Sequence, residues 1–307
     1  MKIPAPGRSV NGLHEWATGA GAPVVVLEAG IAASSVSWSL VQARVAEYTR
    51  VLSYDRAGFG WSAEGTGGGT ALDAANDLAR MLEASGEAGP FVLAGHSFGG
   101  LIVRVFQQRF PERVAGLVLV DPVVRSEWRN ASDARRRMLN RGVMLSRRGA
   151  LLARVGVVRM ALKLLMSGSR RIPKMMARVS AGKGASVTDR LAGEVRKMPR
   201  EHWRAIAQHW SEARSFRAMA DNLERLPDSA GQLEEGRGFG DLPVVVLSAG
   251  GIGGQARPPS QEHVADAGLS SRGEHRVVPD SGHWVQLDAP EAVVDAIGRV
   301  VAKVRAQ

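Results

Sequence analysis

A serine flanked by glycines lies in the segment Gly95–His96–Ser97–Phe98–Gly99. The apolar run Phe91–Val92–Leu93–Ala94 comes directly before it, and a stretch with helical spacing follows. At a sharp turn between a strand and a helix, a serine side chain projects above the sheet, and the glycines let the backbone pack closely. The new helix also directs free N–H groups and its positive dipole end toward a developing oxyanion. The segment therefore predicts that Ser97 is a nucleophile.

A candidate general base, His283, lies in the segment Ser281–Gly282–His283–Trp284 near the end of the sequence. It follows the last apolar run and precedes the last helical pattern. An imidazole at this position can reach Ser97 across the carboxyl edge of a sheet and act as general base, then general acid. The other histidines lie inside the serine segment, in an early strand, in the middle of the chain, or away from a strand end: His96, His14, His202, His209, His263 and His275.

The composition excludes several kinds of site. The 307 residues contain no cysteine, so disulfides, thiolate metal sites and cysteine nucleophiles are absent. No His/Asp cluster has the spacing of metal ligands, and we expect neither a metal nor a cofactor. The N-terminus lacks the apolar core of a secretory signal, and the most apolar long window, residues 149–166, contains three basic residues. We therefore expect a cytoplasmic protein without a transmembrane segment.

Short apolar runs alternate with helical patterns over the first 121 residues. A capping box at Thr70–Asp73 predicts a helix to about Ser85, and residues 98–110 predict a second helix. Strand–helix alternation of this kind predicts a doubly wound parallel sheet, covered by helices on both faces. The predicted strands are residues 24–27, 50–54, 91–94, 114–120, 243–247 and 275–278, and a helix from about residue 290 to 304 closes the chain.

The middle of the chain, residues 123–240, has no strand-like run. It contains 25 Lys and Arg against 11 Asp and Glu, although the whole chain has a net charge of only +10. Five apolar residues have the spacing of a single helix face and predict an apolar stripe on one helix: Leu151, Val155, Val158, Leu162 and Leu165. These patterns predict an α/β core made of residues 1–122 and 241–307, with residues 123–240 as a helical insertion.

Five segments in this order resemble the α/β-hydrolase superfamily, in particular its serine-nucleophile members with a helical cap: VVVLEAG, SYDRAGFGWS, LAGHSFGG, GLVLVDP and DSGHWVQLDAPEAVVDAI. The resemblance implies an eight-stranded, mostly parallel sheet flanked by helices, with an α-helical cap inserted after the sixth strand. Residues 10–16 would supply the antiparallel start of the sheet. It also implies an oxyanion hole made from the amides of Ile31 and Phe98, while Asp55 and Arg56 would shape the loop beneath the site.

The sequence departs from the family pattern at the triad acid. Most members carry that acid in the loop after the seventh strand, but residues 248–255 here contain no carboxylate. Asp121, at the end of the sixth strand, is the favoured acid, because a buried imidazolium needs a nearby anion. Asp266 and Glu262 are the alternatives, and a Ser–His dyad without an acid is a third.

The resemblance implies acyl transfer in two steps, with a carboxylic ester as the broadest substrate class. A serine at position 97 argues against dehalogenase and epoxide hydrolase chemistry, which needs a carboxylate nucleophile. Two alternatives remain: C–C bond hydrolysis or perhydrolysis on the same residues, and a non-catalytic ligand-binding protein. We expect a small acyl substrate, apolar or anionic, and no nucleic-acid partner, since no binding motif accompanies the basic charge. That charge fits a solvated surface, anionic substrates or peripheral contact with anionic lipid.

Overall fold

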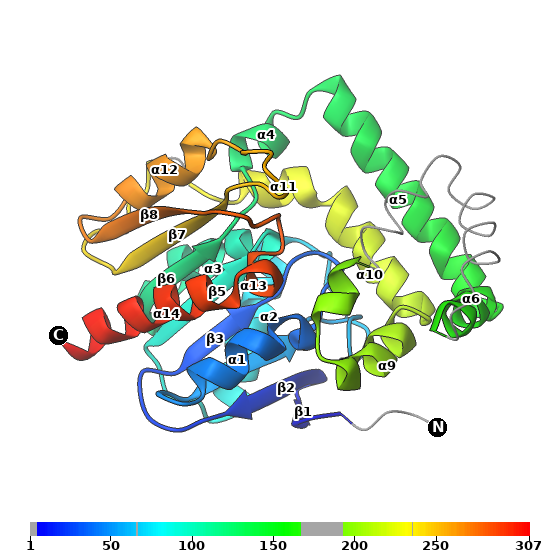
Figure 1. Ribbon diagram of the computed structural model, residues 1–307, viewed down its shortest axis with the longest axis horizontal. Coiled ribbons are helices and arrows are strands. Elements are labelled where there is room, and N and C mark those ends of the chain that lie inside the picture. The colour runs from blue at the N-terminus through cyan, green and yellow to red at the C-terminus, as the bar shows by residue number, and fades with distance from the viewer. Residues whose placement is uncertain (1–4, 66, 167–192, 235) are drawn as a thin grey trace.

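The computed structural model describes residues 5–65, 67–166, 193–234 and 236–307. Its centre is an eight-stranded sheet in the order β1-β2-β4-β3-β5-β6-β7-β8 (Figure 1). β1 and β2 are antiparallel to their neighbours, and the remaining strands are parallel. The predicted eight-stranded, mostly parallel sheet is thereby confirmed. The strands are β1 Arg8–Val10, β2 Leu13–Thr18, β3 Val25–Glu28, β4 Val51–Asp55, β5 Phe91–His96, β6 Val114–Val120, β7 Val244–Ala249 and β8 Gly273–Val278.

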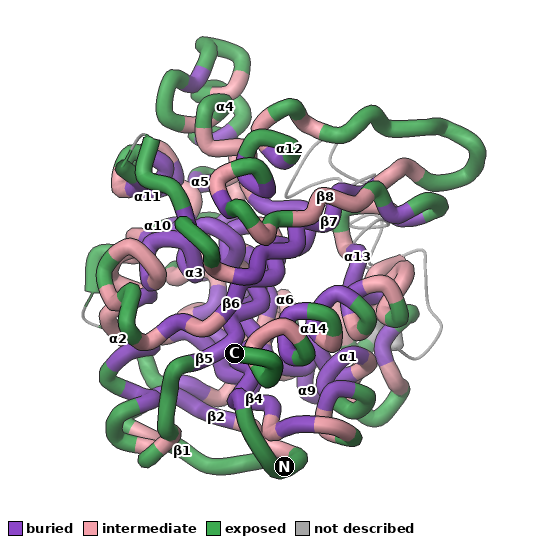
Figure 2. Tube along the Cα trace, turned by 90° about the vertical axis from the view of Figure 1, so that its left-hand side faces the viewer, coloured by how far each residue is buried: buried purple, intermediate pink, exposed green. Residues whose placement is uncertain are grey.

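The central strands are buried on both faces, which explains why their sequences are continuous apolar runs. Every residue of β3, β4, β5 and β7 is buried, and Figure 2 shows the strands enclosed at the middle of the molecule. Alternate side chains enter different clusters: Val26 and Leu93 point to one face, and Leu27 and Val92 to the other. Because successive side chains of a strand point to opposite faces, the sheet has a separate hydrophobic core on each face.

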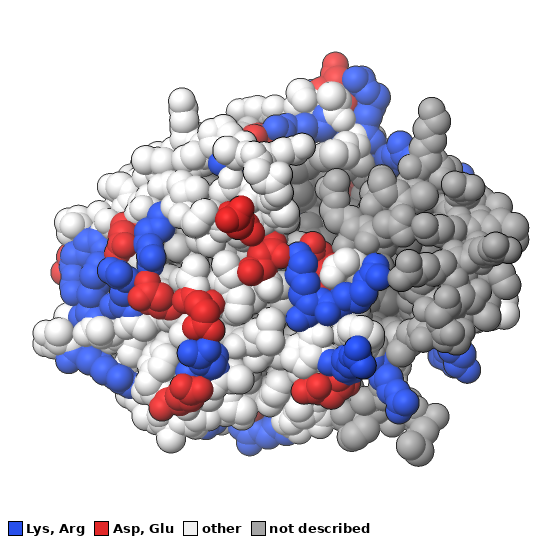
Figure 3. All heavy atoms as spheres, in the orientation of Figure 1, with Lys and Arg blue, Asp and Glu red and all other residues white. Residues whose placement is uncertain are grey.

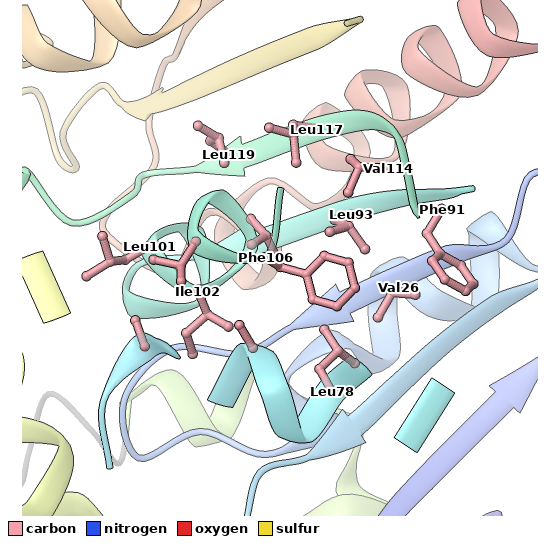
Figure 4. Packing of buried hydrophobic residues seen from close by; sticks show 14 of the residues in the cluster. Val26, Leu78, Phe91, Leu93, Leu101, Ile102, Phe106, Val114, Leu117 and Leu119 are labelled. Atoms are coloured by element: carbon pink, nitrogen blue, oxygen red, sulfur yellow. The ribbon is translucent and has the colours of Figure 1, made fainter. Parts of the chain in front are cut away.

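Helices on each face complete these two cores. α2 (Ala71–Ala84), α3 (Phe98–Arg109) and α12 (Gln261–Gly268) cover one face, and α1 (Ser39–Val45) and α14 (Pro290–Arg305) cover the other. Figure 4 shows Leu78 of α2 and Phe106 of α3 lying against Val26 of the sheet. The predicted capping box is present at the start of α2, where Thr70 and Asp73 bond each other's backbone.

The antiparallel start of the sheet differs in detail from the prediction. Residues 10–16 do not form one strand, because Asn11 and Gly12 take positive φ angles of 49° and 80°. Two successive residues with positive φ form a tight hairpin turn, which here joins β1 to β2. The asparagine–glycine pair in the sequence is the local signal for that turn.

Between β6 and β7 the described residues form helices and no strand. These are α4 Arg125–Arg129, α5 Asp133–Arg154, α6 Val157–Met166, a helical segment at 193–197, α9 Arg200–His209, α10 Ala213–Glu224 and α11 Leu226–Gly231. α5 packs along α10, which separates it from the sheet in Figure 1. No helix in the described ranges is long and apolar enough to cross a membrane.

The predicted apolar stripe from Leu151 to Leu165 is wrong. α5 ends at Arg154, Gly156 takes a positive φ of 77°, and α6 starts in a new direction at Val157. Leu151 and Val155 consequently point outward and are 63% and 72% exposed. A glycine in the left-handed region breaks helical periodicity, so apolar spacing across it does not describe one face. The side chain of Leu165 lies outside the described part of the structure.

Candidate active site

Ser97 occupies the sharp turn between β5 and α3. Its backbone has φ 54° and ψ −117°, far from both strand and helix. The turn requires glycine on either side, since a Cβ at Gly95 would lie 2.4 Å from the Gly99 carbonyl oxygen. A Cβ at Gly99 would meet the Glu28 carbonyl oxygen at 2.3 Å. The chain therefore holds the serine half-buried above the carboxyl edge of the sheet, in a strained conformation that closely packed glycines permit.

The structure brings His283 to Ser97 although 186 positions separate them in sequence. The Nε2 atom of His283 lies 2.9 Å from the Ser97 Oγ atom, and its Nδ1 atom lies 2.7 Å from Asp121 Oδ2. An imidazole that donates Nδ1–H to a carboxylate leaves Nε2 free to accept, so the Ser97 hydroxyl donates to it. The three side chains form a continuous relay that can move a proton from the serine to the imidazole.

Asp121 is built into the end of β6 as a buried carboxylate. Its backbone takes a positive φ of 39°, and its amide donates to Leu247 at 2.7 Å. The Oδ1 atom accepts the Ala249 amide at 3.1 Å, which leaves Oδ2 for His283. Burial alone would raise the pKa of this carboxyl. The hydrogen bond and charge of His283, the Ala249 amide and Arg257 outweigh burial and hold the pKa well below its usual range.

The guanidinium of Arg257 also binds the oxygen of Asp121 that faces His283. The Arg257 Nη1 atom lies 3.0 Å from Asp121 Oδ2, and the guanidinium is 50% exposed while the carboxylate is 2% exposed. Arg257 belongs to the loop after β7, and its amide donates to the Gly250 carbonyl at 2.8 Å. In most members of the family that the sequence resembles, this loop carries the triad acid. In this chain it instead places the Arg257 guanidinium on Asp121. No feature of the sequence pattern pointed to Arg257.

The two alternative acids lie elsewhere. Asp266 receives both terminal nitrogens of Arg104 at 2.8 Å, in a pair that is nearly fully buried. Glu262 accepts the backbone amides of Arg125 and Ser126, at 2.5 and 2.9 Å, and so holds the start of the helical insertion. Neither carboxylate has a contact with His283 among the described residues. Of the candidate acids, only Asp121 meets the imidazole there.

The loop after β3 lies against Ser97. A Cβ at Gly30 would stand 3.3 Å from the Ser97 Cβ, so the backbone passes close to the serine there. The Ile31 amide makes no backbone hydrogen bond within the described ranges. The Phe98 amide is the first of α3 and has no acceptor within the helix. Both predicted donors are therefore available beside Ser97, where an oxyanion would develop.

Arg56 anchors this loop from beneath. Its buried guanidinium donates to the carbonyls of Ala29, at 2.5 Å, and Gly30, at 2.7 Å, and it pairs with Glu28 at 2.5 Å. Tyr54 donates its hydroxyl to the same glutamate. Burial raises the pKa of Glu28, and the charge and hydrogen bond of Arg56 and the Tyr54 hydroxyl only partly counter it. This network fixes the Ala29 and Gly30 carbonyls of the loop.

His96, inside the serine segment, supports the base rather than the nucleophile. Its Nε2 atom donates to the His283 backbone carbonyl at 2.7 Å, and the two rings lie 4.8 Å apart. Burial, together with the nearby His283, lowers the pKa of His96 to about 3, so this ring stays neutral at ordinary pH. Within the described ranges no group of His, Asp and Glu has an arrangement that could hold a metal ion.

Comparison with known proteins identifies the family of this chain. The model of the family described as "Alpha/beta hydrolase family" matches residues 24–296. An AB hydrolase superfamily protein of Gibberella zeae is 37% identical over 103 residues, which cover 32% of this chain and 32% of that protein. RutD of Azorhizobium caulinodans, a proposed carbamate hydrolase, is 34% identical over 123 residues, covering 39% of this chain and 46% of RutD. The chain thus spans less than half the length of these curated relatives.

Solved structures show the same fold over the whole chain. A thermophilic esterase from Thermogutta terrifontis superposes with a TM-score of 0.63 and 24% sequence identity, and the alignment covers 99% of both chains. A likeness at this identity establishes the arrangement of strands and helices.

Proposed function

This chain belongs to the alpha/beta hydrolase family, and we propose that it hydrolyses carboxylic esters or similar acyl compounds through a serine nucleophile. The observation that carries this proposal is the relay from Ser97 through His283 to the buried carboxylate of Asp121, with distances of 2.9 and 2.7 Å. A strained serine, an imidazole and a carboxylate in hydrogen-bonding sequence are the arrangement that activates a hydroxyl for attack on a carbonyl.

The reaction follows from these positions. Ser97 attacks the carbonyl carbon while His283 Nε2 takes its proton, and Asp121 stabilises the resulting imidazolium. The amides of Ile31 and Phe98 donate to the carbonyl oxygen as it becomes an oxyanion. His283 returns the proton to the leaving alkoxide, which departs as an alcohol. Water then attacks the acyl-serine with His283 again as base, and the acid product leaves.

The helical insertion, residues 123–240, is proposed as a cap that shapes the substrate pocket beside this relay. Trp284, adjacent to the base, packs in a cluster with Met198 and Ile206 of the insertion. Lys197 of the insertion pairs with Asp288, whose carboxylate accepts the Gly282 amide at 2.8 Å. The insertion therefore contacts the His283 loop on both its apolar and its polar sides.

Amide-like acyl compounds are the second substrate class. The same relay can expel an amine after His283 protonates it, and the partial likeness to the proposed carbamate hydrolase RutD favours this class over C–C bond cleavage. A substrate panel of p-nitrophenyl esters of increasing acyl length together with aryl carbamates separates the two classes.

A fluorophosphonate probe tests the mechanism directly. We expect one probe per chain in the wild type and none in Ser97→Ala, while Ser271→Ala, at an exposed serine outside the site, keeps full labelling. His283→Ala and Asp121→Asn should each lower kcat by roughly ten-thousand-fold on p-nitrophenyl acetate. Asp266→Asn, matched to Asp121→Asn in chemistry but paired with Arg104, should retain turnover. Absence of labelling and turnover in folded wild-type protein would favour a ligand-binding protein instead.

A further inference from the structure

The outer face of α5 carries a stripe of arginine and apolar side chains, which we call the α5 stripe. Its six residues are separated by steps of four and three, and all are exposed: Arg137, Arg141, Met144, Arg148, Leu151 and Val155. Steps of four and three keep successive side chains on one side of a helix. The buried residues of α5 lie on the opposite side, where the helix packs on α10: Leu139, Val143, Ala150 and Ala153.

Several large apolar side chains on this stripe, and one beside it, are exposed to solvent. Leu151 and Val155 are 63% and 72% exposed, Met144 is 42% exposed, and Met160 at the start of α6 is 53% exposed. One helical turn separates Leu151 from Val155, so their side chains form a continuous apolar surface. A contiguous exposed apolar patch on a protein surface typically marks a place where another body binds.

The charge around this patch is positive. α5 and α6 contain nine basic residues and one acidic residue, Asp133. Arg137 and Arg148 form no ion pair with another described residue, so their charge is not neutralised by the protein there. Figure 3 shows mixed signs over the sheet domain, but basic atoms predominate along the edge where α5 begins.

From this juxtaposition we infer that the α5 stripe docks on an anionic lipid bilayer. Arginines would bind lipid phosphates while Met144, Leu151 and Val155 enter the boundary between headgroups and acyl chains. A nucleic acid offers phosphates but no apolar layer for these three side chains. A second copy of the chain offers apolar surface, but none of the six stripe residues is acidic, so their arginines would find no anion on the same stripe of a partner. A bilayer with anionic headgroups supplies both phosphates for the arginines and an apolar layer for the three apolar side chains.

Vesicle sedimentation tests the inference. The full chain is incubated with large vesicles of phosphatidylcholine alone or with about one third phosphatidylglycerol. We expect binding to the anionic vesicles only, and weaker binding as salt concentration rises. The double variant Arg137→Gln/Arg148→Gln should bind roughly thirty-fold more weakly, because each arginine near an anionic surface adds about a fivefold factor.

Apolar variants separate docking from diffuse charge attraction. Leu151→Glu/Val155→Glu should lose at least about tenfold in binding, while Val264→Glu/Val277→Glu provides the matched control. Val264 and Val277 are 49% and 45% exposed but lie outside the insertion. Circular dichroism and the unfolding midpoint confirm that each variant folds. The inference would be overturned if Val264→Glu/Val277→Glu lost as much binding as Leu151→Glu/Val155→Glu. It would also be overturned if Leu151→Glu/Val155→Glu bound as well as the wild type. A concentration-dependent dimer that the Leu151/Val155 change abolishes would overturn it as well.

Discussion

Removing Arg257 tests whether its charge acts on the base of the proposed relay. The Arg257 and His283 nitrogens approach the same Asp121 oxygen at 3.0 and 2.7 Å, so they lie no more than about 6 Å apart. A guanidinium at that distance repels the imidazolium that forms when His283 takes the Ser97 proton. Because Arg257 is half exposed, an effective dielectric constant of about 40 to 80 applies, which gives roughly 0.7 to 1.4 kcal/mol of repulsion. That energy corresponds to about a three- to tenfold factor in rate.

The expected result follows from the sign of that interaction. Arg257→Gln removes that repulsion from the transition state. At one fixed pH, kcat/KM for a p-nitrophenyl ester should therefore rise about three- to tenfold. Arg257→Lys keeps the charge and should leave kcat/KM close to its wild-type value. Arg276→Gln, an exposed arginine paired with Asp295 on the protein surface, serves as the control.

Two outcomes would refute this reasoning. An unchanged kcat/KM in Arg257→Gln would mean that the guanidinium does not act on the base in solution. A fall in kcat/KM in Arg257→Gln but not in Arg257→Lys would mean that Arg257 acts chiefly by holding the position of Asp121.

The remaining predictions concern the supports of the site. Arg56→Lys should lower kcat up to about a hundredfold with little change in KM, because lysine cannot bridge the two loop carbonyls; steady-state kinetics measures this. Gly99→Ala should lower the free energy of unfolding by about 3 kcal/mol in urea titration, since its Cβ would stand 2.3 Å from the Glu28 carbonyl oxygen. Burial lowers the pKa of His209 to about 4. The unfolded chain therefore binds a proton that the fold excludes, and stability falls as pH drops from about 6.5 toward 4. His209→Phe should remove roughly 2 kcal/mol of the stability loss between pH 7 and 5, measured by urea unfolding at each pH.

Local sequence was enough to predict the parallel strands and the turn and loop in which Ser97 and His283 lie. Each lies in a short segment whose residue types have one physical explanation, such as the glycines that a sharp turn requires or the apolar runs that a doubly covered sheet requires. The prediction of Asp121 rested on its place at the end of β6, and the structure brings it to the imidazole. These predictions depend on which strand end each residue follows. The order of strands and helices in the sequence already determines that.

Features that depend on how loops and helices turn were beyond the sequence. The stripe predicted from Leu151 to Leu165 is wrong because a glycine at 156 redirects the chain, and spacing alone does not reveal that turn. Arg257 belongs to a glycine-rich loop whose path sets where its guanidinium reaches. Nothing in a run of Gly, Ile, Gln and Ala specifies such a path, because these residues leave many backbone conformations open.

The place of the acid and the presence of Arg257 are linked by geometry. Residues 248–255 of the loop after β7 contain no carboxylate, and the same loop carries Arg257. With Asp121 on β6, its Oδ1 atom is held by the Ala249 amide, and only Oδ2 remains for the imidazole. The loop after β7 is then free to place a cation on that same oxygen. In the proposed relay the acid therefore stays ionised, because His283, the Ala249 amide and Arg257 outweigh burial and lower the pKa of Asp121.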